Sequence, residues 1–414
     1  MNAKRYAAVG FWIVCLIVLG IIARGCIQNP NLENDQPISD IEGKPESLDP
    51  NSESWDSTPE SLDSTPESWG STPEEVIEQF VNGYGVEVVS PRMSTFSDEI
   101  ERMRDLIVTL DDRLTRGDDT TEALLNARSA WSTATMTWQK LVFVMVDEEY
   151  SFEDLYHYPH RNRCRLDRMI VPEERDIEGI IALYSTLDVI EYFLFGGSSF
   201  SCPPHVEHLN EDREAWSILS SEEIFRRRIS LARLVANDLY TRVVELRDTW
   251  SLRGEDWALE AFSDRDYAFR RIAESARLLD SFVLYQKLKR PLYECRDPEC
   301  LDKLELRLSK MGLQAIQKNL EGFRVLFYGD QSPGLDDILI VSDASELVER
   351  MNTELAEAEA AARDIPESME RSLLNGDSKV EKLHDEIADV VELLVREIST
   401  VMGVSLIGNT GHMD

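Results

Sequence analysis

Apolar side chains recur at helical spacing along most of the chain from about residue 92 onward. No stretch alternates apolar and polar residues for long enough to indicate a strand. The pattern predicts eight helices, over residues 96–114, 120–146, 177–196, about 220–250, 264–289, 299–328, 343–363 and 378–402. We expect Ser97 to cap the first helix, and Pro291, Gly334 and Pro366 to interrupt the helices of the second half. Eight helices in two sets of four predict an all-α fold with two four-helix-bundle-like halves, residues 92–255 and 256–414.

The helix predicted over residues 177–196 is apolar on nearly all sides, so it should be buried. It nevertheless contains Asp188 and Glu191, which stand three residues apart and therefore project from the same face. Burial of an ionised carboxylate without a partner is costly, by roughly several kcal/mol. We therefore expect this pair to meet an arginine, a histidine or a metal ion.

The densest cationic cluster of this acidic chain lies shortly before that helix, in the sequence YHYPHRNRCRLDRMI of residues 156–170. Its basic side chains are His157, His160, Arg161, Arg163, Arg165 and Arg168. They are the natural partners of Asp188 and Glu191. Two interpretations remain open: a structural network of ion pairs, or a site that recognises an anion, a substrate or a metal ion.

The cysteines indicate an oxidising compartment. Beyond Cys15 and Cys26, the chain contains Cys164, Cys202, Cys295 and Cys300, and an even number in an exported domain suggests disulfides. Cys295 and Cys300 flank a short loop and are expected to pair with each other. Cys164 and Cys202 would then form a second disulfide beside the apolar helix, with a metal–thiolate site as the alternative.

The N-terminus carries a targeting element. Lys4 and Arg5 precede an apolar run over residues 7–23, which ends shortly before Cys26. This pattern fits a membrane anchor, or a secretory signal followed by lipidation of Cys26, and residues 1–27 are assigned to it. In both cases the positive-inside rule places the rest of the chain outside the cytoplasm.

A repetitive acidic segment follows, over residues 28–75. It repeats the pattern STPESLD (57–63), STPESWG (64–70) and STPEE (71–75). A segment dominated by Pro, Ser and Glu buries too little apolar surface to fold. We expect an extended, disordered linker between the anchor and the helical part.

Composition excludes one class of partner. The chain has 78 acidic and 43 basic residues among 414, and a formal net charge of −35. Nucleic-acid binding needs a basic surface that neutralises phosphates, so we expect no nucleic-acid partner. The chain is long enough for two domains with large cores.

Six segments between residues 95 and 414 resemble, in their order and spacing, segments of a known protein family. They are ARSAWSTATMTW (127–138), YHYPHRNRCRLDRMI (156–170), LDVIEYFLFG (187–196), KLKRPLYE (287–294), NLEGFRVLFYG (319–329) and LLVREISTVMGVSL (393–406). In order and spacing they resemble the imelysin-like family of exported bacterial proteins, which are described as iron-regulated or as peptidases. The resemblance implies an all-helical fold of two related four-helix bundles, and a periplasmic lipoprotein.

The family's signature, Gly-x-His-x-x-Glu, corresponds here to residues 186–191. Its glutamate is Glu191, whereas Thr186 replaces the glycine and Asp188 replaces the histidine. An Asp-x-x-Glu pair offers only oxygen, which suits iron(III), calcium or manganese better than zinc. It suits an arginine ion pair equally well.

Three functional hypotheses follow. The first is a membrane-tethered binding protein of the periplasm or cell surface that is associated with iron or haem uptake. It would bind iron, haem or another metal ligand without catalysis, with an iron ion as the candidate cofactor. The second is a metal-dependent peptidase or hydrolase that uses Asp188 and Glu191 with His157 or His160. The third is a structural protein that docks onto a membrane receptor. The iron link comes from the resemblance, and the residues themselves supply the buried acid pair and its cationic neighbours.

Overall fold

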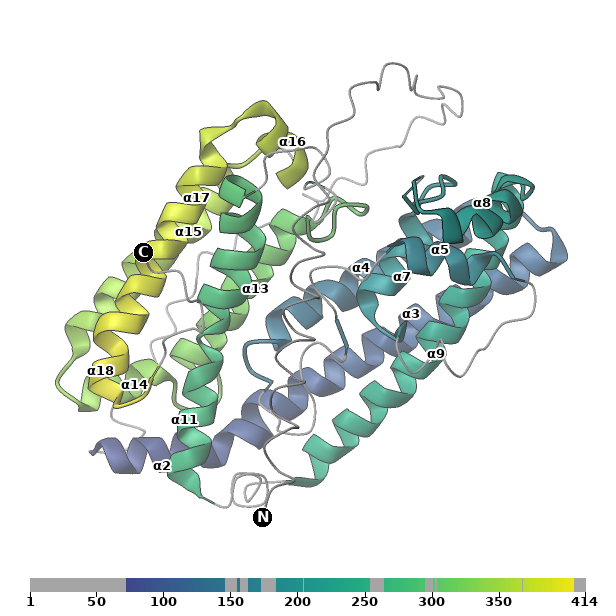
Figure 1. The fold of residues 1–414 in the computed structure, drawn as a ribbon. Helices are drawn as coiled ribbons and strands as arrows, with labels where there is room; N and C mark the ends of the chain where they lie inside the picture. Colours follow the sequence, from purple (N-terminus) through teal and green to yellow (C-terminus); the bar gives the residue numbers. More distant parts are fainter. Residues whose placement is uncertain are drawn as a thin grey trace, which may run out of the picture. The chain divides into compact units, whose positions relative to one another are not determined.

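Every regular element that the structure describes is a helix (Figure 1). The computed structural model describes residues 72–145, 155–156, 163–172, 184–203, 205–253, 264–294, 301, 304–366 and 368–405. Over these residues the predicted all-α fold is confirmed. The chain divides into a unit of residues 1–60 and a unit of residues 61–414, and the described residues belong to the second. The predicted anchor, Cys26 and most of the acidic linker lie outside the described residues.

The helical part begins earlier than the sequence pattern indicates. α2 (Pro73–Gly83) starts at a proline, and Thr72 Oγ1 accepts a hydrogen bond from the amide of Glu75 at 3.3 Å. Thr72 therefore caps α2, inside the segment predicted as linker. η2 (Tyr84–Val89) and α3 (Ser90–Arg116) continue the chain. The prediction that Ser97 caps a helix is wrong, because Ser97 lies buried inside α3.

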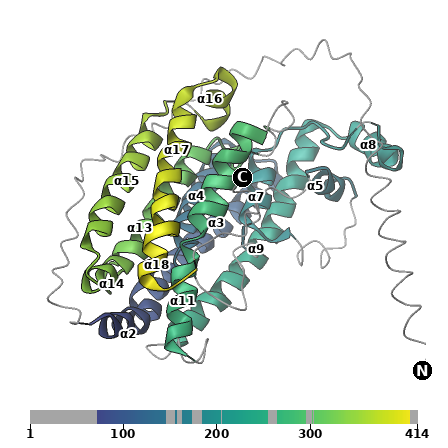
Figure 2. The same ribbon diagram turned by 60° about the vertical axis from the view of Figure 1, so that its left-hand side comes forward.

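One group of helices, the N-terminal group, consists of α3, α4 (Thr121–Leu141), α7 (Leu187–Phe195) and α9 (Ser221–Arg253). α3 packs against both α4 and α9, and α7 packs against α4 and α9 (Figures 1 and 2). Trp131 and Trp138 of α4 are fully buried in this core. The helix-period pattern of apolar residues accounts for the packing.

A second group, the C-terminal group, consists of η6 (Leu279–Glu294), α13 (Gly312–Tyr328), α14 (Leu335–Val341), α15 (Ser345–Asp364) and α17 (Ser378–Leu393). In it α15 and η6 pack against α17, and α13 packs against η6, α14 and α15. The smaller described helices are α5 (Arg163–Ile170), η4 (Glu207–Leu209), α8 (Asn210–Ser217), α11 (Arg265–Ser275), α16 (Met369–Asn375), η7 (Leu394–Ile398) and α18 (Ser399–Met402).

The two groups meet along α4 and α13. A Cβ atom at Gly322 of α13 would lie 2.3 Å from the carbonyl oxygen of Lys140 on α4, so a residue with a side chain would force the helices apart. α2, which continues through η2 into α3, adds a second connection, since it packs against α14 as well as α11. The predicted division of the chain at residues 255 and 256 stays a prediction.

Three predicted helices differ from the observed ones. The described part of the helix expected over 177–196 is interrupted, because Thr186 has extended backbone (φ −135°, ψ 156°) and α7 begins at Leu187. The helix expected over 299–328 opens with a turn of residues 304–310, and α13 begins at Gly312. Pro291 does not end a helix but lies inside η6, a π-helix with wider turns than an α-helix.

Among the described residues, no helix is both long and apolar enough to cross a bilayer. The apolar run at residues 7–23 lies outside the described part.

Candidate functional site

α7 is a short apolar helix held by hydrogen bonds from three directions. The amide of Leu187 donates to the carbonyl of Leu155 at 3.0 Å, and Trp131 Nε1 donates to the carbonyl of Leu187 at 2.9 Å. At the other end, the Arg128 guanidinium donates to the carbonyl of Leu194 at 2.8 and 3.0 Å. A cation at a helix C-terminus is also favoured by the helix dipole. These contacts fix the position of the acids that α7 carries.

Asp188 and Glu191 are buried as predicted, with 3% and 1% of their surface exposed. Glu191 Oε1 accepts two hydrogen bonds from Ser309, one from its amide at 2.9 Å and one from its hydroxyl at 2.8 Å. Ser309 belongs to the turn of residues 304–310, which precedes α13. A segment of the C-terminal half thus contacts the acid pair of α7 directly.

Tyr156 and Glu305 extend the site. The Tyr156 hydroxyl is fully buried and donates to Glu305 Oε1 at 2.8 Å. Burial raises the pKa of Tyr156 well above its usual value, and the negative charges of Glu305, Glu191 and Asp188 raise it further. Tyr156 therefore stays a neutral hydroxyl at neutral pH, among three carboxylates.

Lys287 supplies a buried positive charge beside Glu305. Its Nζ lies 2.7 Å from Glu305 Oε2 and donates to Gln139 Oε1 at 2.9 Å and to Asn319 Oδ1 at 2.6 Å. Gln139 Nε2 donates in turn to Glu305 Oε1 at 3.1 Å. Burial lowers the pKa of Lys287 to about 8, and the charge of Glu305 acts against this fall. The ammonium is thus surrounded by oxygen acceptors, as a metal ion would be.

These polar side chains come from separate parts of the fold. Gln139 lies on α4, Lys287 on η6 and Asn319 on α13, and Glu305 lies in the turn before α13. Together with Asp188, Glu191 and Tyr156 they form one buried polar cluster, here called the junction cluster, where the two helix groups meet. Its carboxylates and hydroxyls are hard oxygen donors that suit a hard cation, and its basic groups suit ion pairing.

The predicted cationic cluster is distributed over several partners. The pKa of Arg163 reflects the groups around it: burial and the charge of Arg307 lower it, whereas Tyr192, Glu191 and Asp167 act in the opposite direction. Arg168 instead pairs with Asp212 of α8 at 2.6 Å, and Arg165 stacks over the Tyr184 ring at 5.4 Å. For Arg165 and Arg168 these observed partners differ from the predicted Asp188 and Glu191. His157, His160 and Arg161 lie outside the described residues.

A second buried ion pair secures the helix that carries Arg163. Arg228 of α9 and Asp167 of α5 lie 3.2 Å apart, with 2% and 0% of their side chains exposed. Tyr192 of α7 donates to Asp167 Oδ1 at 2.6 Å. The predicted disulfide between Cys164 and Cys202 is present, and it ties α5 to the segment that follows α7. Cys295 and Cys300 lie outside the described residues.

Comparison with known proteins agrees with this architecture. The family model Peptidase_M75, described as Imelysin, matches residues 108–396. The chain belongs to the imelysin family. No curated protein sequence matches the chain.

Two solved structures share the imelysin fold with it. One is an imelysin-like protein from Psychrobacter arcticum 273-4, with 13% identity, a TM-score of 0.53, and coverage of 81% of this chain and 98% of that one. The other is a protein of Parabacteroides distasonis ATCC 8503 named as an iron-regulated protein A precursor, with 13% identity, a TM-score of 0.53, and coverage of 81% and 96%.

The residues that correspond to the imelysin signature lie in the first turns of α7. Thr186 is the residue before the helix, Asp188 its second residue and Glu191 its fifth. The Thr186 hydroxyl is buried, and no described residue accepts or donates a hydrogen bond there. Of the two departures from the signature, Asp188 thus belongs to the junction cluster together with Glu191, and Thr186 directly precedes the helix that carries both.

Sequence reasoning missed Lys287, Glu305 and Ser309. A signal for Lys287 was present, because it stands four residues after Val283 and three after Leu284, both buried on the apolar face of η6. Glu305 similarly stands between Leu304 and Leu306, which are buried. A charged residue inside an apolar pattern is the same signal that identified Asp188 and Glu191.

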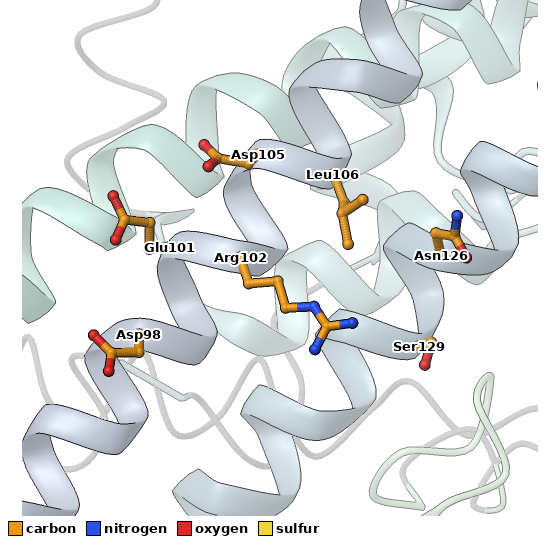
Figure 3. A pocket seen from close by; sticks show the side chains of 7 residues that line it. All are labelled: Asp98, Glu101, Arg102, Asp105, Leu106, Asn126 and Ser129. Atoms are coloured by element: carbon orange, nitrogen blue, oxygen red, sulfur yellow. The ribbon is translucent and has the colours of Figure 1, made fainter.

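Two surface features lie apart from the junction cluster. A depression of about 530 Å³ lies over α3 and α4, and Figure 3 shows Arg102 reaching from α3 toward Asn126 and Ser129 on α4. Glu354, Glu357 and Glu386, on α15 and α17, are a group of three described acids whose carboxylate oxygens lie within 4.8 Å of one another. These carboxylates are exposed or half-exposed, and such groups are common without an ion.

Proposed function

We propose that this protein is an extracytoplasmic binding protein that holds an iron(III) species at the junction cluster, without catalysis. The observation that carries the proposal is the carboxylate pair Asp188 and Glu191, buried next to the Tyr156 hydroxyl where two helix groups meet. Hard oxygen donors of this kind match a hard cation. The name of the Parabacteroides distasonis neighbour supports iron as the metal.

Binding of a cation would change the protonation of the site. Ligand oxygens must be deprotonated, so metal binding releases protons and becomes tighter as the pH rises. Burial and the surrounding carboxylates hold Tyr156 in its neutral form. If it joins the metal, an iron–phenolate absorption band and proton release should appear together.

The location is part of the same proposal. The apolar run at residues 7–23 would tether the protein to a membrane, either directly or through acylation of Cys26. The Cys164–Cys202 disulfide supports a compartment in which disulfides persist. The acidic segment would then space the helical part from the membrane surface.

The test is titration of the purified full-length protein with ferric nitrilotriacetate, followed by absorbance and calorimetry. We expect stoichiometric binding by the parent and at least tenfold weaker binding by Asp188→Asn and by Glu191→Gln. Asp336→Asn is the matched control, because Asp336 is likewise the second residue of a short buried helix, α14, outside the junction cluster. Absence of binding by the parent, or equal loss in the control, would refute the proposal.

A metal-dependent hydrolase is the second candidate, on the strength of the peptidase name of the matching family model. Peptide cleavage by the metal-loaded parent, lost in Asp188→Asn, would favour it over a binding protein. Iron binding without cleavage would favour the first proposal.

A further inference from the structure

The turn of residues 304–310 closes on the acid pair from the C-terminal side. Ser309 donates two hydrogen bonds to Glu191 Oε1, at 2.9 Å from the amide and 2.8 Å from the hydroxyl, and the hydroxyl also lies 3.1 Å from the Leu306 carbonyl oxygen. Within the same turn, Glu305 accepts from the Tyr156 hydroxyl at 2.8 Å. One short segment thus forms hydrogen bonds with both the carboxylate of Glu191 and the hydroxyl of Tyr156.

Ion pairs of two of its side chains anchor the turn. Glu305 is held by Lys287 at 2.7 Å, and Arg307 pairs with Glu370 of α16 at 2.8 Å. Gly312 allows α13 to start directly against it, because a Cβ there would lie 2.8 Å from the carbonyl oxygen of Glu305. The closed turn is therefore a defined arrangement.

The backbone of this turn is strained. Leu306 has φ 49° and Lys310 has φ 64°, both in the left-handed region that L-residues other than Gly, Asn and Asp rarely adopt. Leu306 is fully buried, whereas Lys310 is exposed. Strain of this kind persists only where surrounding contacts maintain it, and it lowers the cost of leaving the closed state.

We propose that residues 304–310 form a latch that competes with the ligand for Glu191 and must withdraw before a cation reaches the acid pair. The latch rests on the proposed function of the junction cluster. A cation bound through Glu191 Oε1 displaces the donors of Ser309. Withdrawal of the turn also breaks the bond between Glu305 and Tyr156, which frees the hydroxyl beside Asp188 and Glu191.

Two variants of the full-length protein test the latch in opposite directions. Lys310→Gly relieves left-handed strain and stabilises the closed turn, so it should weaken binding of ferric nitrilotriacetate by roughly two- to fivefold. Ser309→Ala removes one donor to Glu191 and should tighten binding by about fivefold. Asp343→Gly is the matched control: Asp343 is also exposed, has φ 59° and lies between α14 and α15.

Hydrogen exchange supplies a readout that affinity alone does not. Addition of ferric nitrilotriacetate should speed exchange of the Ser309 amide and its neighbours in the turn, while Asp343→Gly should bind as the parent does. Any of four results would overturn the latch. They are unchanged or tighter binding by Lys310→Gly, a loss of affinity in Asp343→Gly equal to that in Lys310→Gly, weaker binding by Ser309→Ala, and slower exchange of the turn on binding. In each of these cases the parent still binds the ligand, so the proposed function stands without the latch. A parent that does not bind overturns the proposed function, and the latch with it.

Discussion

α7 and α14 are two short apolar helices with the same beginning and different surroundings. Each starts with Leu-Asp, so that Asp188 and Asp336 are the second residues of their helices. α7 packs between α4 and α9, and α14 packs against α13 and α15. The sequences diverge from the next residue onward, and three residues after the aspartate stand Glu191 in α7 and Leu339 in α14.

The charges around the two helices differ more than the helices do. Glu191 receives two donors from Ser309, and Arg163 lies near it. Asp336 instead faces Asp337, and burial together with this second carboxylate raises the pKa of Asp336 to about 8. Its Oδ1 is buried, and no described residue hydrogen-bonds it. A buried acid becomes an anionic site only where another segment supplies donors and cations.

The largest expected effect concerns Lys287, the buried cation of the junction cluster. Lys287→Met leaves Glu305 buried without its positive partner, and loss of one member of a buried ion pair costs about 3–5 kcal/mol. Urea unfolding of the variant at pH 7 measures the change in the free energy of unfolding.

The matched control is the double variant Lys287→Met with Glu305→Gln. Removal of both charges should recover at least half of the loss, because no uncompensated carboxylate remains. If the single variant loses less than about 1 kcal/mol, Lys287 does not neutralise the junction cluster.

The residues that precede the two helices should respond differently to substitution. A Cβ at Gly334 would lie 2.4 Å from the Phe327 carbonyl oxygen and 2.5 Å from Asp336 Oδ1. Gly334→Ala should therefore destabilise the protein by about 3 kcal/mol through overpacking. Thr186→Gly before α7 should cost only about 0.5 kcal/mol, since its side chain makes no capping hydrogen bond. Thermal unfolding of the two variants would show the contrast, and equal losses would contradict it.

Asp336 should make stability depend on pH. With its pKa raised from 3.8 to about 8, the folded protein binds more protons than the unfolded chain between these values, so its stability falls as the pH rises through that window. Asp336→Asn cannot ionise. It should be more stable than the parent by several kcal/mol, roughly 1.4 kcal/mol per unit of pKa difference, at pH 8 and nearly equal to it at pH 4.

A surface acid with the opposite shift serves as the control. Hydrogen bonds from Arg226 and Arg227 hold the pKa of Glu223 at about 2, below its usual 4.5. Its contribution is therefore present above pH 4.5 and lost as the pH falls toward 2. Glu223→Gln should be destabilised at neutral pH only. A constant difference between Asp336→Asn and the parent at every pH would show that Asp336 does not titrate in this window.

Helix-period patterns in the sequence were sufficient to predict the all-α fold and the burial of Asp188 and Glu191. They were also sufficient to place α9 and α15 within a few residues. They could not predict that Ser309 bonds Glu191, because this contact joins residues 118 positions apart. The partner of Arg168 could not be predicted either, because Asp212 lies on another helix and no local sequence pattern relates the two residues. Long-range polar pairing depends on how elements dock, and local patterns carry little information about docking.

The smallest expected effect tests how the start of α7 is held. Trp131→Phe removes the hydrogen bond to the Leu187 carbonyl and should cost about 1 kcal/mol beyond the loss of ring size. Trp138→Phe, on the same helix and equally buried, measures the cost of the smaller ring alone. Urea unfolding of both variants gives the difference. If the losses are equal, the hydrogen bond from Trp131 does not hold the start of α7, and it does not explain how Asp188 and Glu191 are positioned within the junction cluster.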